Sequence, residues 1–252
     1  MLLAFVEVGG VFLKLLFPVL LLLLMGSSLV AAEFPSQVLD LSSWKLTVPE
    51  DTSHPGSPDE RSGKDLAQYA DARYFRVAAD GQAVLFRAPC GGKTTKGSQY
   101  PRCELREMTA RGKDEASWGT ADGQRHTMIT SLAILKTPAV KKHVVCAQIH
   151  DADDDLMMIR LEGKKLFVER NELPDVRLDS NYQLGARFTV KMEAAGGHVK
   201  VWYNEQLKMD WTVSRRGCYF KAGCYTQSNL KKGDAATAAG EVLVYRLGVS
   251  HR

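Results

Sequence analysis

Three segments of the sequence carry polar side chains at alternate positions, which places them on one face of an extended strand. In the first, residues 100–107, this alternation puts Arg102, Glu104 and Arg106 on one side and Cys103 on the other. Guanidinium groups bind carboxylates through paired donors, so this face suits an anionic ligand. An ordinary solvated strand gives the same pattern, and this segment alone favours that simpler interpretation.

The second segment, residues 144–151, places Gln148 and His150 on one face. A glutamine and a histidine two residues apart can both contact one ligand. The alternative is a strand end whose polarity rises toward the acidic run at residues 151–155. That run lacks the glycine and the distal glutamate of an EF-hand loop, so it gives little support for calcium binding.

The third segment, residues 219–227, alternates apolar residues with polar ones. The polar face carries Tyr219, Lys221, Tyr225 and Gln227. Gly223 leaves a gap in this face, where a ligand can approach the backbone closely. If the three segments are neighbouring strands, they form a basic groove that contains a phenol and an imidazole.

The remaining chain predicts an all-β protein. Short runs rich in β-branched and aromatic residues recur between turns, and Gly163 and Gly196 mark two hairpins. Besides the three segments, strands are expected at residues 44–48, 83–88, 127–135, 143–149, 156–161, 165–169, 188–192, 198–203, 208–213 and 241–249. Residues 50–63 read as a loop and residues 65–72 as a short helix. This succession favours a β-jelly roll, a concanavalin-like sandwich of two curved antiparallel sheets with a concave cleft.

Composition limits the class of partner. The 252 residues form one domain by length, and 33 basic residues against 29 acidic ones give a net charge of +4. This balance suits a polyanion but lacks the dense basic runs of a nucleic-acid binder, so no nucleic acid is expected.

The amino terminus predicts secretion. An apolar run between Phe12 and Val30 ends in small residues, and Val30-x-Ala32 fits a signal-peptide cleavage site. A membrane anchor is the alternative, but Pro18 interrupts the run. We therefore expect a signal peptide at residues 1–32, a catalytic domain at 33–252, a secreted, extracellular protein without stable membrane association after cleavage, and a monomer.

Five cysteines follow the predicted cleavage site: Cys90, Cys103, Cys146, Cys218 and Cys224. Their odd number leaves at least one thiol free or paired between molecules. No Cys-x-x-Cys occurs, which disfavours a zinc cage. A Cys218–Cys224 disulfide would require the intervening segment to bend, because an extended segment of that length spans roughly 20 Å.

The three segments resemble, in order and spacing, the three blocks of the family seven alginate lyases. The matching runs are Arg102-Cys103-Glu104-Leu105-Arg106, Gln148-Ile149-His150 and Tyr219-Phe220-Lys221-Ala222-Gly223-Cys224-Tyr225-Thr226-Gln227. The resemblance implies a jelly roll and a β-elimination on 1,4-linked uronates that needs no metal or other cofactor. It places the catalytic roles on Arg102, Gln148, His150 and Tyr225, and substrate binding on Arg106 and Lys221. We add Glu104, Tyr219 and Gln227 to the substrate-binding group, Glu104 also as an ion-pair partner of Arg102 or Arg106.

These residue types suit the chemistry. Removing the C5 proton beside a carboxylate requires that the growing charge be stabilised, which Arg102 and Gln148 can do. His150 is the natural base, or a further donor to the carboxylate, and Tyr225 the acid that protonates O4. Cations near Tyr225 would lower its phenol pKa, so Tyr225 remains an alternative base.

Two other functions compete with alginate cleavage. A non-catalytic carbohydrate-binding module would use the same groove, but binding alone needs neither Tyr225 nor His150. A glycoside hydrolase needs two carboxylates flanking the bond, whereas Glu104 and Glu107 point to opposite faces. Another polyuronate, such as glucuronan, is an alternative substrate. In the family that the sequence resembles, Gln-Ile-His tends to accompany activity on guluronate-containing blocks, so the resemblance implies that preference for Gln148-Ile149-His150.

Overall fold

The computed structural model describes residues 32–53, 55–109 and 112–252. The chain divides into two units between Val30 and Ala31, and all the described residues belong to the second. The predicted signal peptide therefore lies outside the described residues, apart from its last position, Ala32. None of the helices in the described ranges is long and apolar enough to cross a membrane.

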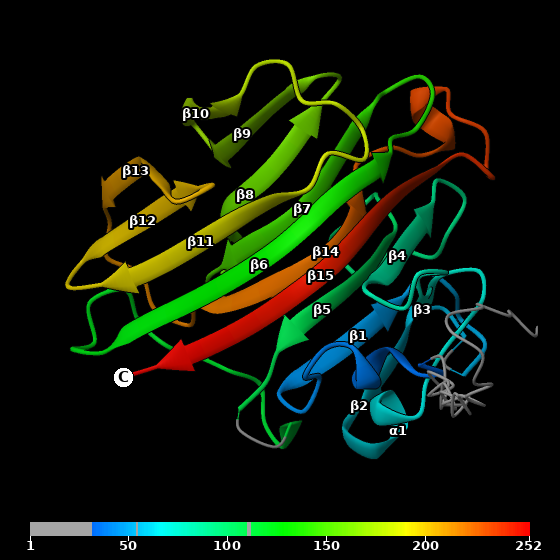
Figure 1. Ribbon diagram of the computed structural model, residues 1–252, viewed down its shortest axis with the longest axis horizontal. Helices are drawn as coiled ribbons and strands as arrows, with labels where there is room; N and C mark the ends of the chain where they lie inside the picture. The colour runs from blue at the N-terminus through cyan, green and yellow to red at the C-terminus, as the bar shows by residue number, and fades with distance from the viewer. Residues whose placement is uncertain (1–31, 54, 110–111) are drawn as a thin grey trace, which may run out of the picture. The chain divides into compact units, whose positions relative to one another are not determined.

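In the described part of the chain, the strands form two antiparallel sheets of eight and seven strands (Figure 1). The eight-stranded sheet has the order β10 (Leu173–Asp179), β9 (Lys165–Arg170), β8 (Asp155–Glu162), β7 (His143–His150), β14 (Tyr219–Thr226), β5 (Arg102–Glu107), β1 (Trp44–Val48) and β2 (Asp59–Ser62). The seven-stranded sheet has the order β13 (Gln206–Thr212), β12 (His198–Tyr203), β11 (Phe188–Ala195), β6 (Arg125–Lys136), β15 (Ala239–His251), β4 (Val84–Pro89) and β3 (Phe75–Val77).

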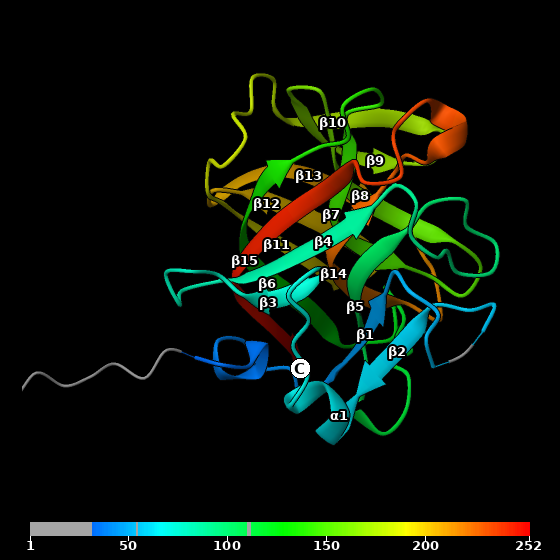
Figure 2. The same cartoon turned by 90° about the vertical axis from the view of Figure 1, so that its right-hand side faces the viewer.

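The core lies between the two sheets. Figure 2 shows β3, β4 and β15 on one side and β5, β1 and β2 on the other. Alternation along each strand sends one set of side chains inward, and Leu105, Ile149 and Phe220 are fully buried among them. The opposite set on β5, β7 and β14 faces away from the core. The predicted jelly roll is confirmed.

Most of the predicted strands are confirmed, with small shifts at their ends. The residue 50–63 loop was wrong in part, because Asp59–Ser62 forms β2. Two further edge strands, β3 and β10, escaped prediction, since β3 has three residues and β10 contains Pro174. The short helix is α1 (Gly63–Ala67) and ends before the predicted residue 72, while short 3-10 turns occur at Pro35–Gln37 and Leu230–Lys232.

All five cysteines lie in the described residues, and all are buried free thiols. Cys218 precedes β14 and Cys224 lies within it, so the strand between them stays extended. Cys103 and Cys224 face the core from opposite positions on β5 and β14, as the alternation predicted.

Gly223 is required by the contact between two strands. β14 bulges against β7 between Ala222 and Tyr225, and Gly223 has φ +139°. A Cβ at this position would lie 2.7 Å from the Cys103 carbonyl oxygen and 2.9 Å from a ring carbon of Phe86. The gap expected for a ligand therefore accommodates the backbone of β5 instead.

We predict that Gly223→Ala lowers the free energy of unfolding by about 2 kcal/mol or more, because the added methyl group meets backbone that cannot move aside. Chemical denaturation measures the change. Gly248→Ala is the control, since nothing lies within 4 Å of its Cβ position. Equal midpoints for both variants would contradict the prediction.

Candidate active site

The three polar segments lie side by side at the centre of the eight-stranded sheet. β14 pairs with β7 on one edge and with β5 on the other. Lys221 stands opposite both Arg106 and Gln148, and Tyr219 stands opposite His150. Tyr225 stands opposite Arg102. The adjacency that the sequence left as a condition is therefore met.

A groove of about 660 Å³ runs over this outer face. It is lined by Arg102, Arg106, Gln148, His150, Tyr219, Lys221 and Tyr225, together with Lys45, Thr47, Glu60, residues 95–100, Asp153, Asp154, Asp155 and Lys232. Seven of the nine predicted site residues thus share one surface. The other two, Glu104 and Gln227, do not line it.

Glu104 lies beneath the groove and holds three of its side chains. Its side chain is fully buried. One carboxylate oxygen accepts from Arg102 Nη1 at 3.1 Å and from Lys221 Nζ at 2.7 Å. The other oxygen accepts from Gln148 Nε2. The ion-pair partners are therefore Arg102 and Lys221 rather than Arg106, which pairs with Glu115 at 2.9 Å.

Burial and charge act in opposite directions on this cluster. Burial raises the pKa of Glu104, but Lys221 and Arg102 outweigh it, so the net shift is downward and the carboxylate stays ionised. Burial lowers the pKa of Lys221 to about 8, against the opposing effect of Glu104. Arg102 Nε has no hydrogen-bond partner among the described residues, and Gln148 keeps one amide proton free.

His150 is held as a neutral ring with one free nitrogen. Its Nδ1 lies 3.0 Å from the carbonyl oxygen of Asp151, which can only accept, so Nδ1 carries the proton and Nε2 does not. Burial lowers the pKa of His150. The Tyr219 ring stacks on the His150 ring with centroids 5.0 Å apart. The Arg106 guanidinium lies over the Tyr219 ring, 3.8 Å from its centroid.

Tyr225 differs from expectation in its acidity. The Arg102 guanidinium lies 3.9 Å from the centre of the Tyr225 ring and favours the phenolate, as predicted. Burial has the larger effect, however, and raises the phenol pKa. The hydroxyl lies 3.1 Å from Ser98 Oγ. Tyr225 is therefore held protonated, which suits an acid better than a base.

Gln227 lies just beyond the end of β14. It is buried, and its amide donates to the Met158 sulfur at 3.7 Å. Sequence reasoning also missed residues that line the groove from loops and from β1, such as Ser98, Tyr100 and Lys45. The Tyr100-Pro101 lead-in was noted as part of the resemblance, whereas nothing in the pattern marks Ser98.

The described residues contain no cluster of side chains suited to a metal ion. Across residues 32–53, 55–109 and 112–252, no three His, Cys, Asp or Glu side chains stand close enough together to hold an ion.

The comparisons with known proteins identify the family. The sequence model described as alginate lyase matches residues 39–251. The chain belongs to the alginate lyase family. It is a polysaccharide lyase by family, and its solved neighbours carry the same fold.

Two solved structures are similar over 88% of this chain and 100% of their own length. An alginate lyase of polysaccharide lyase family 7, AlgAT5, is 52% identical with a TM-score of 0.84. The alginate lyase from Corynebacterium sp. is 41% identical with a TM-score of 0.83. A variant of the family 7 alginate lyase A1-II′, solved in complex with substrate (GGMG), is 26% identical with a TM-score of 0.74 and covers 87% of this chain and 97% of its own.

A curated alginate lyase from Klebsiella pneumoniae is 36% identical over 110 residues, which are 43% of this chain and 35% of that protein. The chain thus matches about a third of the length of this curated relative.

We predict that Glu104→Gln lowers the free energy of unfolding at neutral pH by about 3 kcal/mol, because Arg102 and Lys221 would remain buried without a counter-charge. Denaturation midpoints measure it. Glu115→Gln is the control: Glu115 is half exposed and pairs with Arg106 and Lys45, so its loss should cost under about 1 kcal/mol.

The difference in unfolding free energy between the wild type and Glu104→Gln should depend on pH. The pKa of Glu104 is lowered by folding, so its stabilisation is present above the unfolded pKa of about 4.3 and is lost as the pH falls through the folded value. The stability difference between the wild type and Glu104→Gln should therefore shrink in acid. A difference that stays constant down to pH 2 would contradict this assignment.

Proposed function

We propose that the protein cleaves the 1,4-linked uronates of alginate by β-elimination and leaves a 4,5-unsaturated uronate at the new non-reducing end. The observation that carries this proposal is the convergence of Arg102, Gln148, His150 and Tyr225 on one groove. Membership of the alginate lyase family supports it, and so does the substrate-bound structure of A1-II′.

Charge stabilisation comes first in the reaction. As the C5 proton leaves, negative charge accumulates on the uronate carboxylate. Arg102 offers guanidinium donors, and Gln148 offers its free amide proton. Glu104 fixes both donors from below, so they are oriented before the substrate binds.

Proton transfer then needs a base and an acid. The unprotonated Nε2 of His150 accepts the C5 proton, and the electron pair of that C–H bond forms the C4–C5 double bond. The C4–O4 bond breaks, and the Tyr225 hydroxyl donates its proton to O4. The pKa shifts of both residues favour these starting states, a neutral imidazole and a neutral phenol.

We propose that this chemistry needs no metal or other cofactor, because Arg102 and Lys221 already place two cationic groups at the groove floor. We also propose that the polymer lies in the groove of a monomer. The lysines that line the groove, Lys45, Lys96 and Lys232, suit its remaining carboxylates.

Secretion is part of the proposal. Alginate is a polymer too large to enter a cell unaided, so a lyase that acts on it outside the cell needs export. The apolar run before Ala32 supports a signal peptide at residues 1–32, followed by an extracellular catalytic domain at 33–252 without stable membrane association.

We also propose that the enzyme prefers guluronate-containing blocks, and the stereochemistry of the elimination supports this. In mannuronate the C5 proton and O4 leave from the same face, so one group can serve as both base and acid. In guluronate they leave from opposite faces, which requires two groups. His150 on β7 and Tyr225 on β14 supply two separate groups, which supports this preference.

We predict that His150→Ala lowers kcat/KM on guluronate blocks by about 100-fold and on mannuronate blocks by about tenfold or less, because Tyr225 can take both roles only for the second polymer. Initial rates on the two block types measure the ratio. His198→Ala, which removes an exposed histidine of β12, is the control. Equal losses on both polymers would count against two-sided catalysis.

The test of the proposed function follows the ultraviolet absorbance of the new double bond. Purified residues 33–252 are incubated with alginate in the presence of a chelator, beside Tyr225→Phe. We expect the wild type to produce a steady rise and Tyr225→Phe to lower kcat by at least about 100-fold, since O4 loses its proton donor. Tyr245→Phe, on β15, is the matched control.

No rise by the wild type, with alginate still bound, would reject catalysis in favour of a binding module. A rise on glucuronan but not on alginate would replace the substrate and keep the chemistry.

A further inference from the structure

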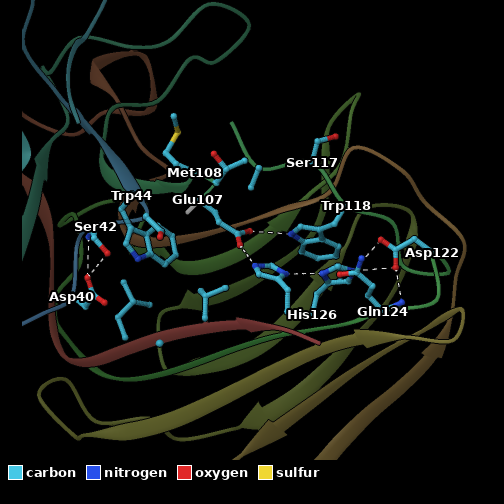
Figure 3. Close-up of a pocket in the computed structure, with 17 residues that line it drawn as sticks. Asp40, Ser42, Trp44, Glu107, Met108, Ser117, Trp118, Asp122, Gln124 and His126 are labelled. Atoms are coloured by element: carbon cyan, nitrogen blue, oxygen red, sulfur yellow. Dashed lines mark hydrogen bonds and ion pairs between the residues drawn. The ribbon is translucent and has the colours of Figure 1, made fainter. Parts of the chain in front are cut away.

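A second cavity, of about 490 Å³, lies away from the groove residues. Its lining comes from β1, β5, β6, β15 and the segment around Trp118. Figure 3 shows Glu107, Trp118, His126 and Asp122 pointing toward one another within it. These side chains form a chain of contacts that the proposed reaction does not use.

This series of side-chain contacts includes four titratable groups: Asp122, His126, His251 and Glu107. Asp122 contacts His126 Nε2 at 3.0 Å. His126 Nδ1 lies 2.7 Å from His251 Nδ1. His251 Nε2 lies 2.7 Å from one Glu107 oxygen. Each of these three contacts is a hydrogen bond only if one proton lies in it.

The three contacts together need one more proton than two neutral imidazole rings carry. Two neutral rings carry two protons in total, whereas three contacts need three. With only two, either the two Nδ1 lone pairs face each other or a carboxylate lacks its donor. With four, two Nδ1 protons would collide at 2.7 Å. Three protons satisfy every contact.

A carboxyl group lies at each end of these contacts. Burial raises the pKa of Asp122, but the amide protons of Gly119 and Gln124 and the His126 ring lower it to about 2, so it stays ionised. Glu107 is fully enclosed, and its second oxygen accepts from Trp118 Nε1 at 3.0 Å and from the Phe220 amide at 2.9 Å. Trp118 stacks on His126 with centroids 4.5 Å apart.

Among the described residues, few other ionisable groups lie near these four side chains. Asp40 lines the same cavity and pairs with Ser42, and the Cys218 thiol, whose pKa burial raises to about 12, lies close to Trp118 through the Trp118–Cys218 bridge. Neither contacts an imidazole nitrogen. Only Asp122, His126, His251 and Glu107 are therefore in position to share a third proton.

Glu107 connects this chain to the groove. It follows Arg106 on β5, and it binds the amide of Phe220, which follows Tyr219 on β14. Arg106 and Tyr219 contact each other across the groove floor, and Tyr219 carries the stacked His150 ring. Glu107 therefore joins the β5 and β14 backbones directly beside Arg106 and Tyr219.

We propose that Glu107 is a positioning residue for the Arg106–Tyr219–His150 stack, held in place by one extra proton shared between His251 and His126. These contacts join the end of β15 and the start of β6 to the end of β5 and the start of β14. The kinetic part of this inference rests on the proposed function, whereas the proton count does not.

Nuclear magnetic resonance of the protein with ¹⁵N-labelled histidine tests the count at pH 7. We expect three of the four ring nitrogens of His126 and His251 to carry protons. In Glu107→Gln the side-chain amide donates to His251 Nε2, so the count should fall to two while all contacts persist. Asp210→Asn, beside exposed His198, is the matched control and should leave the count at three. A count of two protons on these four nitrogens in the wild type would overturn the proposal of a shared extra proton.

Kinetics test the positioning. Glu107→Ala should lower kcat on alginate by about tenfold with KM within about twofold, and Glu107→Gln should restore most of it. Because Glu107→Ala can fail to fold, His251→Ala is measured in parallel; its side chain is 37% exposed near the chain end, and the same drop is expected. Wild-type kcat in His251→Ala, well below its melting temperature, would overturn the positioning role. If the wild type does not cleave alginate, the proposed function fails, and the proton count still stands or falls by resonance alone.

Discussion

One buried carboxylate organises the groove. Glu104 brings Arg102, Gln148 and Lys221 to a single point, from two strands on either side of β14 and from β14 itself. A buried charge is costly unless it is paired and hydrogen-bonded, and here both oxygens are occupied by donors. The same pairing leaves each donor with capacity toward solvent. The cluster therefore places positive charge at the groove surface while the negative charge stays below it.

The fold makes this arrangement possible by separating core and groove onto the two faces of the same strands. Alternation sends Cys103, Leu105 and Phe220 inward and their neighbours outward. Gly223 then allows β5 and β14 to approach so closely that a side chain would not fit. Because strands are held by ladders on both edges, the donors sit on rigid backbone, as electrostatic preorganisation requires. At the end of β5, Glu107 lies on the core side of the strand and is likewise a buried carboxylate that accepts from several donors.

The sequence was sufficient for the fold class and for the face shared by each polar segment, because strand periodicity determines both. It did not identify the edge strands β2, β3 and β10, whose short length or Pro174 weakens the pattern. It could not show that Glu104 lies below the groove, because strand alternation predicts which face a side chain points to but not how deeply that side chain is buried. The rise in the Tyr225 pKa depends on burial, and the His126–His251 contact joins residues 125 positions apart. Neither leaves a local signal.

The central role of Glu104 depends on where the uronate carboxylate binds. A crystal structure of Tyr225→Phe with a guluronate-containing oligosaccharide measures this directly. We predict that one carboxylate lies within hydrogen-bond distance of Arg102 and Gln148, directly above Glu104, with C5 facing Nε2 of His150. A sugar whose carboxylate binds Arg106 and Lys45 instead, with its C5 turned away from His150, would contradict the central role of the Glu104 cluster.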